Sequence, residues 1–161
     1  MKAGEFTFSL DFLFGLHAIA GKEEALEWGC FRSGGVIIAG SNYLPPKAEA
    51  LNRKFSELLV SINAFDDIYD IYDIYDKAIH VFLLMARNKF FYGANRRTGR
   101  LMMNSILLDA GYPPLNLSAK YKLKLKLNEL MMRFYDSDDE PEMNLFLRSC
   151  IDPKLVEIMS E

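Results

Sequence analysis

The stretch Lys89-Phe-Phe-Tyr-Gly-Ala-Asn-Arg-Arg-Thr-Gly-Arg100 decides how the rest of the chain is interpreted. Its small residues Gly93 and Ala94 permit a tight turn, and residues 95–109, which follow directly, have the character of a central helix. The first N–H groups of a helix have no partner within it, and together with the helix dipole they attract anions. The sequence therefore predicts a phosphate-binding turn at a helix N-terminus.

Three arginines strengthen this prediction. Arg96, Arg97 and Arg100 supply forked N–H donors suited to phosphate oxygens. Arg97 and Arg100 are three residues apart, so they share one face of the helix. The alternative is a basic first turn that pairs with acidic loops elsewhere in the fold.

The charge of the chain is unevenly distributed. Residues 77–126 contain ten of the 19 Lys and Arg residues but only one acid, Asp109, which gives this segment +9 and the rest of the chain −12. Such an excess indicates an anionic partner, namely phosphate, a nucleotide, nucleic acid or an acidic protein surface. The two regions can also neutralise each other within the fold, and the charge count alone leaves both possibilities open.

The flanking segments are mostly helical by the spacing of their apolar residues. One predicted helix, Lys77 to Arg87, is apolar on every side, which is typical of a helix in the middle of a domain. We expect residues 136–142, an acidic stretch with a proline, to form a loop. The further predicted helices cover residues 9–20, 47–62, 95–109, 120–134 and 143–150, with another that starts at Asp152-Pro153.

Phe31 to Pro46 has a different pattern. A glycine pair, a β-branched run and a closing proline pair predict a strand or hairpin at the surface. Three Ile-Tyr-Asp repeats cover residues 68–76 and read as a tandem expansion before the central helix, with solvated aspartates. The repeats lack the glycine-containing loop and terminal Glu of a calcium site, so no metal is expected there.

The run Arg97-Thr-Gly-Arg-Leu-Met-Met-Asn104 resembles the Arg-Thr-Gly-Arg-Leu-Leu-Met-Asn of the Fic/Doc family. The resemblance extends over roughly residues 9–150. It implies one all-α domain over residues 1–161 that transfers AMP, or phosphate in Doc relatives, from ATP to a protein hydroxyl. Residues 31–46 resemble the family's flap, a short β-hairpin that holds the target protein. The flap residues implied are Gly34, Gly35, Val36, Ile37 and Ile38.

The motif at residues 89–100 is carried over only in part. Phe91 falls on the family's core Phe, Asn95 on the Asn of its anion loop, and Arg97 and Arg100 on its two arginines. Arg96 falls where Doc has Lys and AMP-transferring members have Gly. The nucleotide-phosphate site implied is Gly93, Ala94, Asn95, Arg96, Arg97 and Arg100.

Two positions depart from the family pattern. Lys89 stands at the position of the catalytic His, and Gly93 stands at the position of the acidic residue that holds Mg²⁺. A general base contributes about 10²–10⁴ in rate, and an ordinary lysine with a pKa near ~10.4 is almost fully protonated at neutral pH. We expect a weak or altered transferase that uses ATP or another nucleotide, with its need for Mg²⁺ left open and no metal ligand assigned.

Two alternatives remain at this point. One is a catalytically inactive module that binds a nucleotide or a protein. The other is a nucleic-acid-binding protein that uses the +9 segment, although aromatic residues for base stacking are sparse near its arginines. No apolar run is long enough for a bilayer, and the two cysteines fit a reducing compartment, so we expect no membrane partner and a cytoplasmic location.

Overall fold

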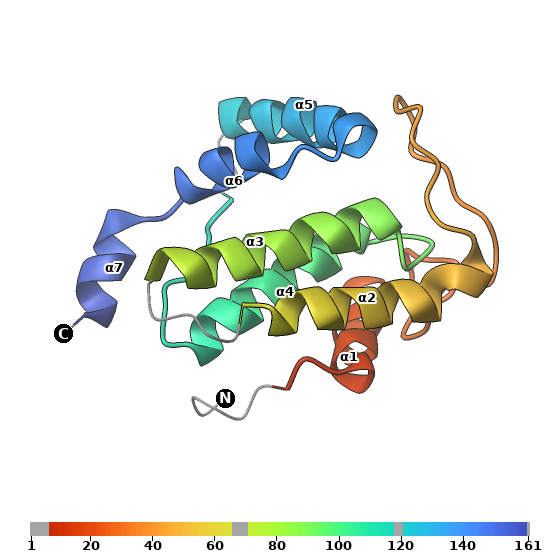
Figure 1. Ribbon diagram of the computed structural model, residues 1–161, viewed down its shortest axis with the longest axis horizontal. Coiled ribbons are helices and arrows are strands. Elements are labelled where there is room, and N and C mark those ends of the chain that lie inside the picture. Colours follow the sequence, from red (N-terminus) through yellow and green to blue (C-terminus); the bar gives the residue numbers. More distant parts are fainter. Residues whose placement is uncertain (1–6, 66–70, 118–120, 161) are drawn as a thin grey trace.

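Helix α3 (Ile71–Asn88) is the central element of the fold (Figure 1). In the computed structural model, which describes residues 7–65, 71–117 and 121–160, α3 packs against α4 (Asn95–Asp109), α2 (Leu51–Asn63) and α6 (Glu140–Arg148). Its central turns are buried almost all round, which confirms the prediction of a helix in the middle of the domain. The buried apolar residues are Ala78, Ile79, Val81, Phe82, Leu83, Met85 and Ala86.

Helices α3 and α4 approach each other closely at Gly99. A Cβ atom at this position would lie 3.2 Å from Cδ2 and 3.4 Å from the carbonyl oxygen of Phe82. Because that space is already filled, a larger residue would push α4 away from α3. Gly99 thus fixes how deeply the helix that carries the three arginines sits against the core.

The remaining helices surround this pair. Helix α1 (Leu10–Ala20) packs on α4, α5 (Tyr121–Ser137) packs on α6, and a 3₁₀ turn, η1 (Ala48–Ala50), leads into α2. Ser9 caps the N-terminus of α1 by accepting a hydrogen bond from Phe12 N. In the same way, Asp152 caps the N-terminus of α7 (Pro153–Met159), the last helix of the chain. The described residues contain helices and no strand, in agreement with the all-α prediction. No described helix has the length and apolar character that a bilayer crossing requires.

The prediction of a loop over residues 136–142 is wrong. Helix α5 continues to Ser137 and α6 begins at Glu140, so only Asp138 and Asp139 separate them. Pro141 lies in the first turn of α6, where a proline needs no N–H partner, and Glu140 and Glu142 favour the positive end of the helix dipole. The acidic stretch therefore starts a helix.

The Ile-Tyr-Asp repeats join α3, which begins at Ile71; residues 68–70 of the repeats lie outside the described residues. Tyr75 is buried, and its hydroxyl donates to Pro113 O at 3.0 Å. Asp76 accepts hydrogen bonds from Asn144 and Arg148 of α6. Asp76 therefore links two helices, which corrects the expectation that the aspartates of the repeats are merely solvated.

The segment predicted as the flap, residues 31–46, forms a long loop that contains no strand. Figure 1 shows the segment between α1 and α2 extending away from the helices and returning, but its described residues form no β-ladder, so the expected β-hairpin is not observed. Side chains satisfy its backbone instead. Asp136 of α5 accepts hydrogen bonds from Asn42 N at 3.0 Å and Tyr43 N at 3.3 Å, and Pro45 and Pro46 have no N–H to contribute to a ladder.

Arg32 anchors the base of the flap. Its side chain is 2% exposed and donates to the carbonyl oxygens of Lys89, Gly34, Pro46 and Asn88. Two of these carbonyls lie at the C-terminal end of α3, where the helix dipole favours a cation. Both arms of the flap are therefore tied through one guanidinium to Lys89, the first residue of the motif, and to Asn88 before it.

Replacing this guanidinium tests its role in stability. Arg32→Leu leaves buried carbonyl oxygens without donors, and we expect it to lower the free energy of unfolding by roughly 2–4 kcal/mol in a urea titration. Arg53→Leu is the matched control because the Arg53 side chain is 72% exposed on α2. An Arg32→Leu loss no larger than that of the control contradicts the anchoring role.

Candidate functional site

The loop between α3 and α4 is held by the side chain of Asn95. Asn95 is buried; its Oδ1 accepts from Phe91 N at 3.0 Å and its Nδ2 donates to Phe91 O at 2.7 Å. The turn is tight, because Lys89 before it and Ala94 at its end both have left-handed backbone angles, with φ of 49° and 54°. The first turn of α4 is thus held in a fixed position relative to the end of α3.

His17 of α1 holds this loop in position through a ring stack and a hydrogen bond. Its ring stacks on Phe91 with centroids 3.7 Å apart, Nδ1 accepts from Gly29 N, and Nε2 donates to Gly93 O at 3.1 Å. Burial lowers the pKa of His17, and the Gly93 hydrogen bond only partly opposes that shift. A neutral ring with its proton on Nε2 satisfies both contacts, so His17 acts as a positioning residue for the loop.

The N-terminus of α4 presents free backbone donors. The first α-helical bond runs from Thr98 N to Ala94 O, and no side chain caps the helix. The N–H groups of residues 95–97 precede that bond and donate to no carbonyl of the described residues. This is the arrangement in which a helix terminus binds an anion.

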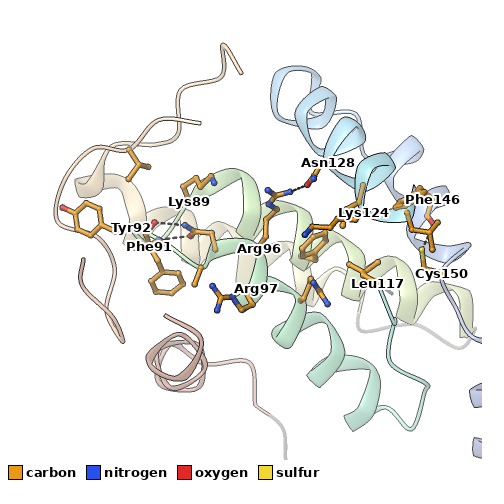
Figure 2. A pocket seen from close by; sticks show the side chains of 18 of the residues that line it. Lys89, Phe91, Tyr92, Arg96, Arg97, Leu117, Lys124, Asn128, Phe146 and Cys150 are labelled. Atoms are coloured by element: carbon orange, nitrogen blue, oxygen red, sulfur yellow. Dashed lines mark hydrogen bonds between the residues drawn. The ribbon is translucent and has the colours of Figure 1, made fainter. Parts of the chain in front are cut away.

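The three arginines of the motif point in different directions. Arg97 forms a bidentate ion pair with Glu24, which follows α1, and Arg96 donates to Asn128 of α5 at 2.8 Å (Figure 2). Arg100 makes no hydrogen bond or ion pair within the described residues. Within the described ranges, the alternative of pairing with an acid therefore holds for Arg97 and not for Arg96 or Arg100. The side chains of that pair are 51% and 58% exposed, so a phosphate can displace Glu24 at small cost.

A cavity of about 870 Å³ lies over this loop and extends between α4, α5 and α6 (Figure 2). Its cationic lining residues are Lys89, Arg96, Arg97, Arg100 and Lys124, and the loop residues Gly93, Ala94 and Asn95 also line it. The other lining residues are mostly apolar and include Phe82, Leu117, Leu123, Leu127, Phe146 and Cys150. Figure 2 shows Leu117, Phe146 and Cys150, together with Lys124, at the end of the cavity away from Lys89. The volume suits a ligand of nucleotide size.

The cavity includes every motif residue predicted to bind phosphate, and Lys89 as well. Of the predicted flap residues it includes Val36 and Ile37 but not Gly34, Gly35 or Ile38. Ile38 is 7% exposed and belongs to the hydrophobic core, whereas Ile37 is 80% exposed. Ile38 therefore anchors the flap, whereas the side chain of Ile37 is exposed to solvent.

Lys89 has an unusual environment for a lysine. Its side chain is half-buried in the cavity wall, and Nζ lies 5.6 Å from the ring centre of Tyr135. Burial lowers the pKa of Lys89, and the nearby charge of Arg96 lowers it further. The neutral amine is thus more accessible than in an exposed lysine, and a bound anion would favour the charged form again.

The described residues do not provide a metal centre. They contain no group of three or more His, Cys, Asp or Glu side chains that could hold an ion, and no carboxylate lines the cavity. Gly93, at the position that the resemblance assigns to the metal-binding acid, has no side chain. Glu24 is the acid nearest to this loop by contact, and both of its oxygens are engaged by Arg97. The residues present do not fit Mg²⁺.

Sequence reasoning missed the contributions of α5 and of the turn after α1. Lys124 and Asn128 lie on α5, and the partners of Asn128 and Glu24 are 32 and 73 residues away in the sequence. The basic composition of residues 120–126 was the only available signal for Lys124. No local pattern connects Glu24 with Arg97.

A second polar cluster lies outside the cavity. His80 of α3 contacts Glu140 of α6 through Nδ1 at 2.9 Å and Ser61 of α2 through Nε2 at 3.1 Å. The Ser61 hydroxyl also donates to Leu58 O at 2.8 Å, so it is engaged within its own helix. We interpret this cluster as a hydrogen-bonded link between three helices.

The chain is similar to a known family and to curated proteins. A family model described as Fic/DOC family matches residues 7–107. "Protein adenylyltransferase Fic" from Nematostella vectensis is 32% identical over 116 residues, which cover 67% of this chain and 25% of that protein. The chain therefore spans about a quarter of the length of this curated relative.

Removing the charge of Glu24 should free Arg97 for an anion. We expect Glu24→Gln to tighten the binding of inorganic phosphate by about two- to fivefold at low ionic strength, the range that an exposed ion pair can supply. Titration calorimetry measures this. Glu23→Gln makes the same change in net charge at an exposed neighbouring residue. Equal effects of the two variants would show that only net charge matters.

Proposed function

The chain belongs to the Fic/DOC family, and from this we propose that it binds a nucleoside triphosphate and slowly transfers AMP, or alternatively phosphate, to a protein hydroxyl. One observation carries the proposal. A single cavity of about 870 Å³ contains both the anion-binding turn of α4 with its cationic side chains and an apolar region. A nucleotide has the same two parts, a polyanionic chain and a flat, largely apolar base.

The phosphates are assigned to the end of the cavity near α4. The free N–H groups of residues 95–97 and the guanidinium of Arg100 supply donors there without breaking any contact of the described chain. Arg97 can join them by leaving its exposed pair with Glu24. Asn95 takes part indirectly, because its side chain is used up in holding Phe91.

The base is assigned to the far end. Leu117 and Phe146 line this end of the cavity and offer apolar surface for stacking (Figure 2). Burial of a base there would place the sugar and α-phosphate between the two ends, next to Arg96, with Lys124 beside the base end (Figure 2). A cavity open toward the flap then leaves the α-phosphorus accessible to a hydroxyl of another protein.

Lys89 is assigned the proton-accepting role that the family gives to a histidine. In AMP transfer the target oxygen bonds to the α-phosphorus, the bond to the leaving pyrophosphate breaks, and the hydroxyl proton goes to a base. Only the neutral amine of Lys89 can accept that proton. Burial in the cavity wall lowers the pKa of Lys89, but bound phosphates would oppose this shift, so we expect the reaction to be slow.

The second candidate is a module that binds a nucleotide or a protein without catalysis. It is favoured by the same two positions, because a protonated Lys89 clamps phosphate and Gly93 contributes no carboxylate. In this alternative the cavity keeps its affinity for nucleotides, and the transfer step is absent.

Radiolabelled ATP distinguishes the two candidates. We expect low transfer from α- or γ-labelled ATP to protein by the natural chain, and an increase of at least about tenfold for Lys89→His with Gly93→Asp, which restores a base that titrates near ~6.5. The rate of the natural chain should rise with pH as Lys89 loses its proton. Lys89→Ala should abolish it. No transfer by any folded variant would favour the non-catalytic module.

The flap is assigned to the target protein. Ile37 is 80% exposed at the cavity rim, and a Cβ atom at Gly35 would meet nothing within 4 Å, so an extended segment could lie alongside residues 34–37. Side chains engage Gly34 O, Asn42 N and Tyr43 N, but within the described residues the backbone of residues 35–37 makes no hydrogen bond and is available for strand addition. Gly34, Gly35, Val36 and Ile37 would contact the target, with Ile38 buried beneath them.

Proline at position 37 tests this assignment. Ile37→Pro removes one backbone donor at an exposed position outside the helices, so we expect unchanged thermal unfolding but at least about a fivefold loss of target modification or binding. Ile37→Ala keeps the donor and serves as the control for the lost side chain. A proline variant that modifies or binds targets as well as the natural chain would remove the flap from target recognition.

A further inference from the structure

We propose that the cavity binds its nucleotide without a divalent cation, and that its own lysines and arginines supply the countercharge. This inference rests on the proposed function, since it concerns the same site. It goes beyond that function because it names the ionic form of the substrate that the site prefers, the metal-free triphosphate.

The first support is the charge of the cavity wall. Five of the lining side chains are cationic, and none of the lining residues is Asp or Glu. The cations come from three elements and surround the space: Lys89 follows α3, Arg96, Arg97 and Arg100 lie on α4, and Lys124 lies on α5. Figure 2 shows Lys89, Arg96 and Lys124 spread along the cavity rather than gathered at one point.

The second support is the position of the nearest acid. The backbone of Glu24 lies beside Gly93, but its carboxylate is held by both terminal nitrogens of Arg97 and does not line the cavity. The hydrogen bond from Arg97, together with its charge, lowers the pKa of Glu24 and favours the ionised carboxylate in this pair. If phosphate displaces Glu24, the carboxylate moves away from Arg97 into solvent, since its side chain is already 58% exposed.

Steric packing does not explain why residue 93 is a glycine and not an acidic residue. A Cβ atom there would lie 3.5 Å from the Cα and Cβ atoms of Ala25, which is an ordinary contact. The loop could therefore carry an acid, and the chain instead has a glycine beside a strongly cationic wall. The composition of the site is complementary to phosphate alone and not to a metal–phosphate complex.

Electrostatics then favours the metal-free nucleotide. A cation placed about 4 Å from one positive side chain is opposed by roughly 4 kcal/mol per pair of unit charges at an effective dielectric constant near 20. Mg²⁺ also neutralises part of the triphosphate charge and occupies oxygens that the arginines would otherwise bind. In this cavity Mg²⁺ would weaken the attraction between the protein and the triphosphate. In a site lined by acidic residues the same ion strengthens that attraction.

The test compares ATP affinity with and without Mg²⁺. Calorimetric titrations of the full chain with ATP are carried out in EDTA and in excess MgCl₂ at equal ionic strength. We expect binding in EDTA to be about two- to tenfold tighter. Affinity that is tenfold weaker in EDTA would overturn the inference while leaving the proposed nucleotide binding intact. No binding in either buffer would overturn both.

A pair of lysine variants shows whether the wall supplies the countercharge. Lys124 lines the cavity, whereas Lys122 is exposed on the same helix outside the lining. In EDTA we expect Lys124→Ala to weaken ATP binding by about fivefold or more and Lys122→Ala by less than about twofold. Adenosine, which has no phosphate, should bind both variants equally. Equal losses of ATP affinity in the two variants would contradict a specific countercharge in the wall.

Gly93→Asp provides the converse test. An acid at this position introduces a ligand for the ion and an opposing charge for free phosphates, so Mg²⁺ should change from weakening ATP binding to strengthening it. A variant that still binds ATP more tightly in EDTA would show that residue 93 does not control the ion preference, and would count against the inference.

Discussion

The pair of hydrogen bonds between the Asn95 side chain and the Phe91 backbone is the constraint on which the site depends. It closes the turn between the two most closely packed helices, and His17 braces the same turn through Gly93 and the ring of Phe91. Because these contacts use a buried amide and a neutral ring, the turn needs no ion to hold its shape. The free N–H groups of α4 and the flanking cations are consequently positioned before any ligand arrives.

The site gathers like charges that the fold must tolerate. Arg97 forms an ion pair with Glu24, and Arg96 donates a hydrogen bond to Asn128. Lys89 lies near the ring of Tyr135, and burial lowers its pKa. Each contact is weak or exposed, so an anion can replace it without a large loss. The cations that would bind a nucleotide repel one another until it is bound, so the arrangement that favours binding destabilises the unliganded protein.

The local features of this fold could be predicted from the sequence, and the long-range ones could not. Apolar spacing gave the helices, and the small residues before Asn95 gave the turn and the start of α4 at the observed residue. The flap was predicted as a hairpin because Val36 to Ile38 read as a strand. Arg32 instead links Pro46 to Lys89, and Asp136 of α5 binds Asn42 N. These partners are 14 to 94 residues apart in the sequence, so no local pattern indicates the contacts. Lys124 entered the cavity through the packing of α5.

A crystal structure of the chain with ATP tests the central claim most directly. The account predicts phosphate oxygens within hydrogen-bond distance of the N–H groups of residues 95–97 and of Arg100, and the base between Leu117 and Phe146. It also predicts the Asn95–Phe91 contacts unchanged. ATP bound elsewhere, or a cavity that stays empty at millimolar ATP while Arg97 remains on Glu24, would contradict it.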